Sequence, residues 1–71
     1  MSKIMLAEDD DFLRIMTKTV LEMEGFQVYA FENGLVALES FLSVAPDLIV
    51  SDVSMPFLNG YGLLEGVRRL P

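Results

Sequence analysis

The sequence predicts an α/β protein in which short strands alternate with helices in the order β-α-β-α-β-α. Short apolar runs of strand length alternate with segments whose apolar residues recur at helical spacing. The third of these runs is apolar at every position, as expected of a strand covered on both faces. Strands that alternate with helices in this way favour right-handed β-α-β units and a parallel sheet.

The first β-α unit is the most clearly marked. The compact apolar run Ile4–Ala7 predicts a strand. A helix follows, and either Asp10 or Asp11 can cap its first turn. Gly25 is well placed to end this helix. Its residues at helical spacing are Phe12, Ile15, Met16, Thr19, Val20 and Met23.

The second unit begins with alternation of apolar and other residues, where Phe26, Val28 and Ala30 predict a short strand. The pair Asn33-Gly34 is typical of a turn. A second helix is expected to stop before Pro46. Its apolar face is formed by Leu35, Leu38, Phe41 and Leu42.

The third unit contains the run Leu48-Ile49-Val50, which predicts a strand buried between helix layers. Asp52 follows at the carboxyl end of this strand. A third helix is then expected, closed by Pro71, with its apolar residues at Leu63, Leu64, Val67 and Leu70.

The composition excludes several classes of function. Seventy-one residues suffice for one small domain, and the absence of cysteine and histidine excludes disulfides and the usual zinc sites. A net charge of −6, from 11 acidic and 5 basic residues, argues against direct binding of nucleic acid. No apolar run is long enough to span a membrane and no secretory signal is visible, so a cytoplasmic location is expected.

Acidic side chains follow two of the predicted strands. Glu8 and Asp9 begin a run of four acids directly after the first strand, and Asp52 follows the third. Ligand sites in open α/β sheets lie beyond the carboxyl ends of the strands, so three carboxylates converge if these strands are neighbours. Such a set suits a hard cation such as Mg²⁺, and a carboxylate beside the metal can be a nucleophile toward phosphorus. The alternative is a purely structural role, with Asp10 and Asp11 as helix caps and Asp52 as a turn residue.

Three segments of the chain resemble a known family. Lys3–Arg14 reads KIMLAEDDDFLR, Phe31–Leu38 reads FENGLVAL, and Pro46–Arg68 reads PDLIVSDVSMPFLNGYGLLEGVR. In this order they resemble response-regulator receiver domains of the chemotaxis-regulator kind. The phosphoacceptor segment is matched by Asp52, Met55, Pro56 and Gly60.

The resemblance implies a flavodoxin-like parallel sheet with strand order 2-1-3 in this segment, and a role in two-component signalling rather than in metabolic catalysis. Asp52 would accept a phosphoryl group from a histidine kinase or phosphotransfer protein. Asp9 would bind Mg²⁺ directly, Glu8 would act through water or as a second acid, and the backbone carbonyl of Ser54 would supply another ligand. The side chain of Arg14 is expected at the surface.

The resemblance also implies that residues 1–71 are a partial receiver domain, ending before the fourth strand. Receivers carry a Ser or Thr on the fourth strand and a Lys on the fifth, so phosphorylation and its readout are expected to be impaired here. The third strand would be an exposed apolar edge, which together with 52% hydrophobic residues predicts self-association about a two-fold axis.

Two alternative functions remain open at this stage. One is a phosphohydrolase with an aspartyl nucleophile, although such enzymes need a second Asp where this chain has Ser54. The other is an interaction or dimerisation module that is not phosphorylated.

Overall fold

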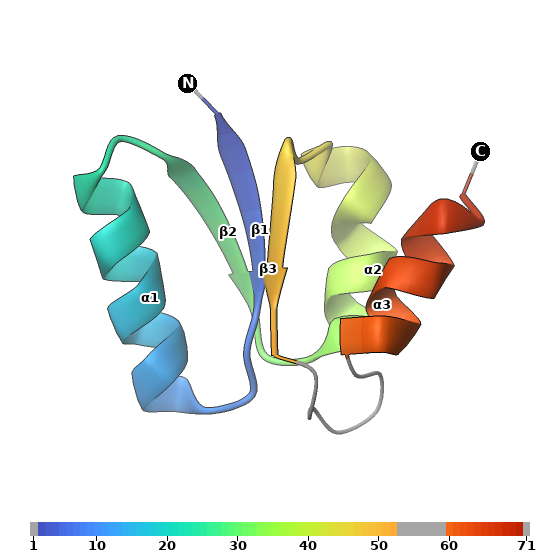
Figure 1. The fold of residues 1–71 in the computed structure, drawn as a ribbon, viewed down its shortest axis with the longest axis horizontal. Coiled ribbons are helices and arrows are strands. Elements are labelled where there is room, and N and C mark those ends of the chain that lie inside the picture. The colour runs from blue at the N-terminus through green and yellow to red at the C-terminus, as the bar shows by residue number, and fades with distance from the viewer. Residues whose placement is uncertain (1, 53–59, 71) are drawn as a thin grey trace.

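The computed structural model describes residues 2–52 and 60–70. The described chain forms three parallel strands and three helices that alternate along the sequence (Figure 1). The strand order is β2-β1-β3, which confirms the predicted fold class and topology. The elements are β1 (Lys3–Ala7), α1 (Asp11–Met23), β2 (Gln27–Phe31), α2 (Gly34–Val44), β3 (Leu48–Ser51) and α3 (Gly60–Arg68).

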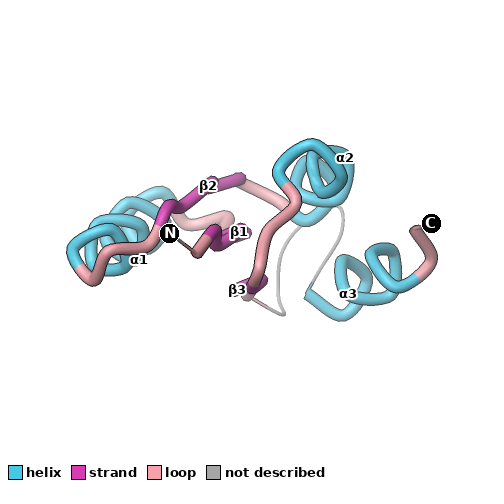
Figure 2. The backbone as a smooth tube through the Cα atoms, turned by 90° about the horizontal axis from the view of Figure 1, so that it is seen from above, coloured by secondary structure: helices cyan, strands magenta, loops and turns pink. Residues whose placement is uncertain are grey.

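Helices lie on both faces of the sheet, with α1 on one side and α2 and α3 on the other (Figure 2). Successive residues of the central strand β1 point to opposite faces, and both sets are buried. Met5 and Ala7 pack with Ala37 of α2, and Val67 of α3 lies against the same cluster. Ile4 and Leu6 form the core on the other face. Because β1 is the central strand, its carboxyl end lies in the middle of the sheet edge that carries the acidic residues.

The apolar residues that identify α1 in the sequence are exposed in the structure. Phe12 is 70% and Met23 is 81% exposed, and no residue of α1 is buried. The half-buried side chains of the helix are instead Arg14, Thr17, Lys18 and Leu21. Helix α1 packs mainly against β2 and makes only a few contacts with β1. Its apolar stripe therefore faces away from the sheet, although the helix itself is where the spacing predicted it.

On the same face of the sheet, β3 is also open. Leu48 pairs in register with Ile4, so both side chains point to the α1 side of the sheet. Leu48 is nevertheless 55% exposed, whereas Ile4 is buried. Among the described residues, β3 pairs with β1 alone and is an edge strand. The prediction of a third strand covered on both faces was therefore wrong for its amino end.

Polar side chains and unusual backbone angles set the helix ends. Asp10 caps α1 by accepting a hydrogen bond from the backbone N–H of Leu13 at 2.9 Å. Asn33, expected in a turn, caps α2 in the same way through the N–H of Val36. Gly25 follows α1 with φ +96°, a left-handed conformation that glycine adopts without strain.

Within residues 2–52 and 60–70, no helix has both the length and the apolar character needed to cross a bilayer.

Candidate functional site

The candidate site lies where β1 and β3 end. The last residues of the two strands, Ala7 and Ser51, are paired in register. The backbone N–H of Asp52 continues this pairing by donating to the carbonyl of Ala7 at 3.1 Å. The N–H of Glu8 donates to the carbonyl of Phe31 at the end of β2 at 3.0 Å. Glu8 and Asp52 thus start from fixed backbone positions at adjacent strand ends.

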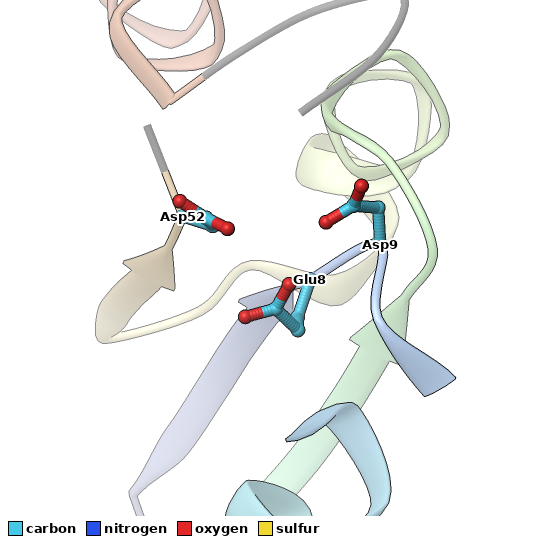
Figure 3. Close-up of side chains that lie close together, drawn as sticks. All are labelled: Glu8, Asp9 and Asp52. Carbon is cyan, nitrogen blue, oxygen red and sulfur yellow. The ribbon is translucent and has the colours of Figure 1, made fainter. Parts of the chain in front are cut away.

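The three carboxylates of Glu8, Asp9 and Asp52 face one another across a small space (Figure 3). Each offers one oxygen, and these oxygens all lie within 4.8 Å of one another. Oxygens on opposite sides of one magnesium ion are about 4 Å apart, so a small rotation of the side chains lets the set share one ion. Glu8 and Asp52 are half-buried and Asp9 is exposed, which leaves coordination positions for water or a phosphoryl oxygen. The donor set, entirely carboxylate, fits Mg²⁺.

The surroundings of Glu8 make its carboxyl group harder to ionise. Its pKa is raised above the ordinary value of 4.5, first because partial burial disfavours the charged form. A side-chain hydrogen bond with Asp9 and repulsion from the charges of Asp52 and Asp9 raise the pKa further. The backbone N–H of Asp10 donates to the Glu8 carboxylate at 3.2 Å and opposes the shift. A bound cation would remove the repulsion and favour the ionised form.

Arg14 contacts the segment that carries Glu8 and Asp9. The prediction that it is only a surface side chain was therefore wrong. The side chain is 19% exposed, although it belongs to the first turns of a largely exposed helix. One terminal nitrogen, Nη1, donates to the backbone carbonyl of Glu8 at 3.0 Å. The other, Nη2, forms an ion pair with Asp11. The sequence signal for this residue is its position six residues after Glu8, the first acidic residue beyond β1.

The other acids of the run have structural roles. Asp10 caps α1 and Asp11 pairs with Arg14, so the structural interpretation applies to these two residues. The predicted ligand Ser54 lies outside the described residues, as do Met55 and Pro56. The structure thus brings together three of the four predicted site residues and does not describe the fourth.

Comparisons with known proteins show which family this fold resembles. The family model for the response regulator receiver domain matches residues 4–71. The chain is 42% identical over 65 residues to the transcriptional regulatory protein CseB of Streptomyces coelicolor, which covers 92% of this chain and 28% of that relative. It is 35% identical over 69 residues to the chemotaxis protein CheY of Bacillus subtilis, covering 96% of this chain and 58% of CheY.

Solved structures show the same likeness. The chemotaxis protein CheY4 of Vibrio cholerae superposes with a TM-score of 0.91 at 31% identity, over 96% of this chain and 57% of that one. The response regulator TrrA of Thermotoga maritima, solved in complex with Mg²⁺-BeF, gives a TM-score of 0.90 at 32% identity, over 97% and 60% of the two chains. The chain thus spans little more than half of the receiver structures that it matches. Fold, acidic strand ends and family match agree, and the chain belongs to the response regulator receiver domain family.

Proposed function

We propose that this chain accepts a phosphoryl group on Asp52 in two-component signal transduction, with Mg²⁺ held by Glu8, Asp9 and Asp52. The family match supports a role in two-component signalling, in which receiver domains generally serve as phosphoacceptors. The observation that carries the finer proposal is the convergence of three carboxylates at the ends of β1 and β3. The Mg²⁺-BeF complex of TrrA, a structural relative, supports the choice of metal.

Asp52 is the best nucleophile of the three. Asp9 is exposed and follows Glu8 directly, so both belong to one segment on one side of the cluster. Asp52 follows a different strand, β3, and faces them from its end. An arrangement of two acids opposite one suits a pair that holds a cation and a third group that reacts.

The proposed reaction is the transfer of a phosphoryl group from a donor to Asp52. A carboxylate oxygen of Asp52 forms the new O–P bond while the bond from phosphorus to the donor breaks. The electron pair of the broken bond stays with the donor, which for a histidine kinase or phosphotransfer protein is an imidazole nitrogen. Bound Mg²⁺ supplies positive charge that offsets the repulsion between the acidic cluster and the incoming phosphoryl group.

Phosphorylation by a small donor tests this proposal. The chain is incubated with acetyl phosphate and Mg²⁺, and intact mass with peptide mapping follows the product. We expect one added phosphoryl group on Asp52, none in Asp52→Asn, and none without Mg²⁺. Asp10→Asn is the matched control, because it also removes one charge from the acidic region while asparagine preserves the helix cap. Modification of Asp52→Asn to the same extent would contradict the proposal, and continuous phosphate release without stable modification would favour the aspartyl phosphohydrolase.

Self-association remains a second proposal, with a second copy of this chain as the partner. Its support is that β3 is an edge strand among residues 2–52 and 60–70 and that Leu48 is exposed. Two identical edges can pair antiparallel across a two-fold axis, each supplying the backbone groups that the other needs. Sedimentation velocity over a range of concentrations tests it, and a folded chain that stays monomeric throughout rejects it. The cytoplasmic location and the absence of direct binding to nucleic acid or membrane stay predictions.

A further inference from the structure

We propose that Arg14 is a positioning residue for the carboxylate cluster: its guanidinium fixes the segment between β1 and α1 so that Glu8 and Asp9 stay directed at Asp52. This inference rests on the proposed function, because it concerns the same site. It assigns to Arg14 a role that acts through the backbone of Glu8 and not through contact with a reacting group.

The contacts of Arg14 span the segment on which the two acids lie. Nη1 donates to the backbone carbonyl of Glu8. The N–H of Glu8 in turn donates to the carbonyl of Phe31 in β2. Both backbone groups of Glu8 are therefore satisfied, one by the sheet and one by the side chain of α1. Nη2 pairs with Asp11 at the start of α1. Asp9 lies between these two attachment points, so the guanidinium limits the paths that the segment can take past Asp9.

Arginine suits this position better than lysine. The planar guanidinium carries several N–H donors in a fixed fork and can reach two acceptors in different directions. Here the acceptors are the backbone carbonyl of Glu8 and the carboxylate of Asp11. The lysine ammonium is a single point on a flexible stem, and holding both acceptors with it costs more conformational entropy.

Positioning and simple electrostatics predict opposite results. A positive charge near three carboxylates repels a divalent cation, so its removal should strengthen Mg²⁺ binding if charge is all that matters. If Arg14 positions Glu8 and Asp9, its removal should weaken Mg²⁺ binding because the ligands lose their fixed arrangement. Lys18 offers a matched control: it is a half-buried cation on the same helix, and its ion pair is with Glu22, away from the segment.

The experiment is a Mg²⁺ titration of the 71-residue chain, followed by the NMR amide signals of Glu8, Asp9 and Asp52. Arg14→Met and Lys18→Met each remove one positive charge and keep an unbranched stem. We expect Arg14→Met to raise the Mg²⁺ dissociation constant about tenfold. We expect Lys18→Met to stay within about twofold of wild type, on the tighter side if it moves. Without metal, the backbone order parameter of Asp9 should fall in Arg14→Met alone.

The outcomes distinguish failure of the proposed function from failure of this inference. Absence of saturable Mg²⁺ binding in the wild-type chain would contradict the proposed function and the inference with it. Saturable wild-type binding, with Arg14→Met binding as tightly as Lys18→Met and Asp9 equally ordered, would overturn the inference alone. Should Arg14→Met fail to fold, Arg14→Lys decides the matter. We expect about threefold weaker binding there because the fork is lost, and wild-type affinity would reject the assignment.

Discussion

Replacing Asp52 by asparagine should make the metal-free chain more stable, although it removes the proposed phosphoacceptor. The change is nearly isosteric and leaves the backbone hydrogen bond from Asp52 to Ala7 in place. With ligand oxygens within 4.8 Å of one another, each pair of like charges repels by about 1 kcal/mol at the dielectric constant of water and about 3.5 kcal/mol at an effective value of 20. Asp52→Asn removes two such pairs, those with Glu8 and Asp9.

The lower limit applies best here, because Asp9 is exposed and the other two acids are only half-buried. We therefore expect a gain of about 1–2 kcal/mol in the free energy of unfolding at neutral pH and low ionic strength. The carboxylate of Asp52 should also be needed for Mg²⁺ to stabilise the chain. Added Mg²⁺ should therefore raise the free energy of unfolding of the wild type more than that of Asp52→Asn.

Urea unfolding followed by circular dichroism measures both effects. Salt at several tenths molar should reduce the difference between wild type and Asp52→Asn, because it screens the charges. Asp47→Asn serves as a comparison, since this acid lies at the opposite end of β3 and is not part of the cluster. Equal or lower stability of Asp52→Asn at low salt, with no response to Mg²⁺ in either protein, would refute the reasoning.

Three further predictions follow from the same structure. The raised pKa of Glu8 means that the folded state binds a proton more readily than the unfolded state, so metal-free stability should fall as pH rises from about its ordinary value of 4.5 through the raised value. Glu8→Gln should flatten that part of the profile of urea midpoint against pH, and parallel profiles would contradict the assignment. A Cβ on Gly66 would lie 2.6 Å from Cδ2 of Leu38, so Gly66→Ala should destabilise the chain by about 1 kcal/mol. In a Leu38→Ala background the same substitution should stabilise the chain, because alanine has the higher helix propensity. A change of the same sign in both backgrounds would refute this packing. Leu48→Lys should weaken self-association in sedimentation velocity more than Leu42→Lys on α2, whose leucine is about equally exposed at 60%, and equal effects would exclude the β3 edge.

The sequence predicted the order of elements and the strand topology well, because each apolar run or helical repeat has a distinct period. It also predicted that Glu8, Asp9 and Asp52 meet, since the carboxyl ends of parallel strands lie at one edge of a sheet. Periodicity alone could not show that the apolar stripe of α1, from Phe12 to Met23, is exposed. The period tells which residues share a helix face, whereas what lies opposite that face depends on the placement of the other elements.

Local backbone details were equally beyond the sequence pattern. Asn33-Gly34 suggested a turn, but an asparagine before a helix can equally be its cap, and the structure has the cap. Ala45 ends α2 in the left-handed region at φ 50°, a position where glycine or asparagine is the usual signal. The contacts of Arg14 with Glu8 and Asp11 were missed because a long side chain on an amphipathic helix can point toward water or back to the strand end, and the sequence pattern does not distinguish the two.

The ends of β1 and β3 are proposed to hold one divalent ion between them, and paramagnetic Mn²⁺ in place of Mg²⁺ tests this most directly. We expect substoichiometric Mn²⁺ to broaden the NMR signals of Glu8, Asp9 and Asp52 together, and excess Mg²⁺ to restore all three. Broadening spread over unrelated acids such as Glu39 and Asp47, or confined to Glu8 and Asp9 while Asp52 stays sharp, would contradict the account.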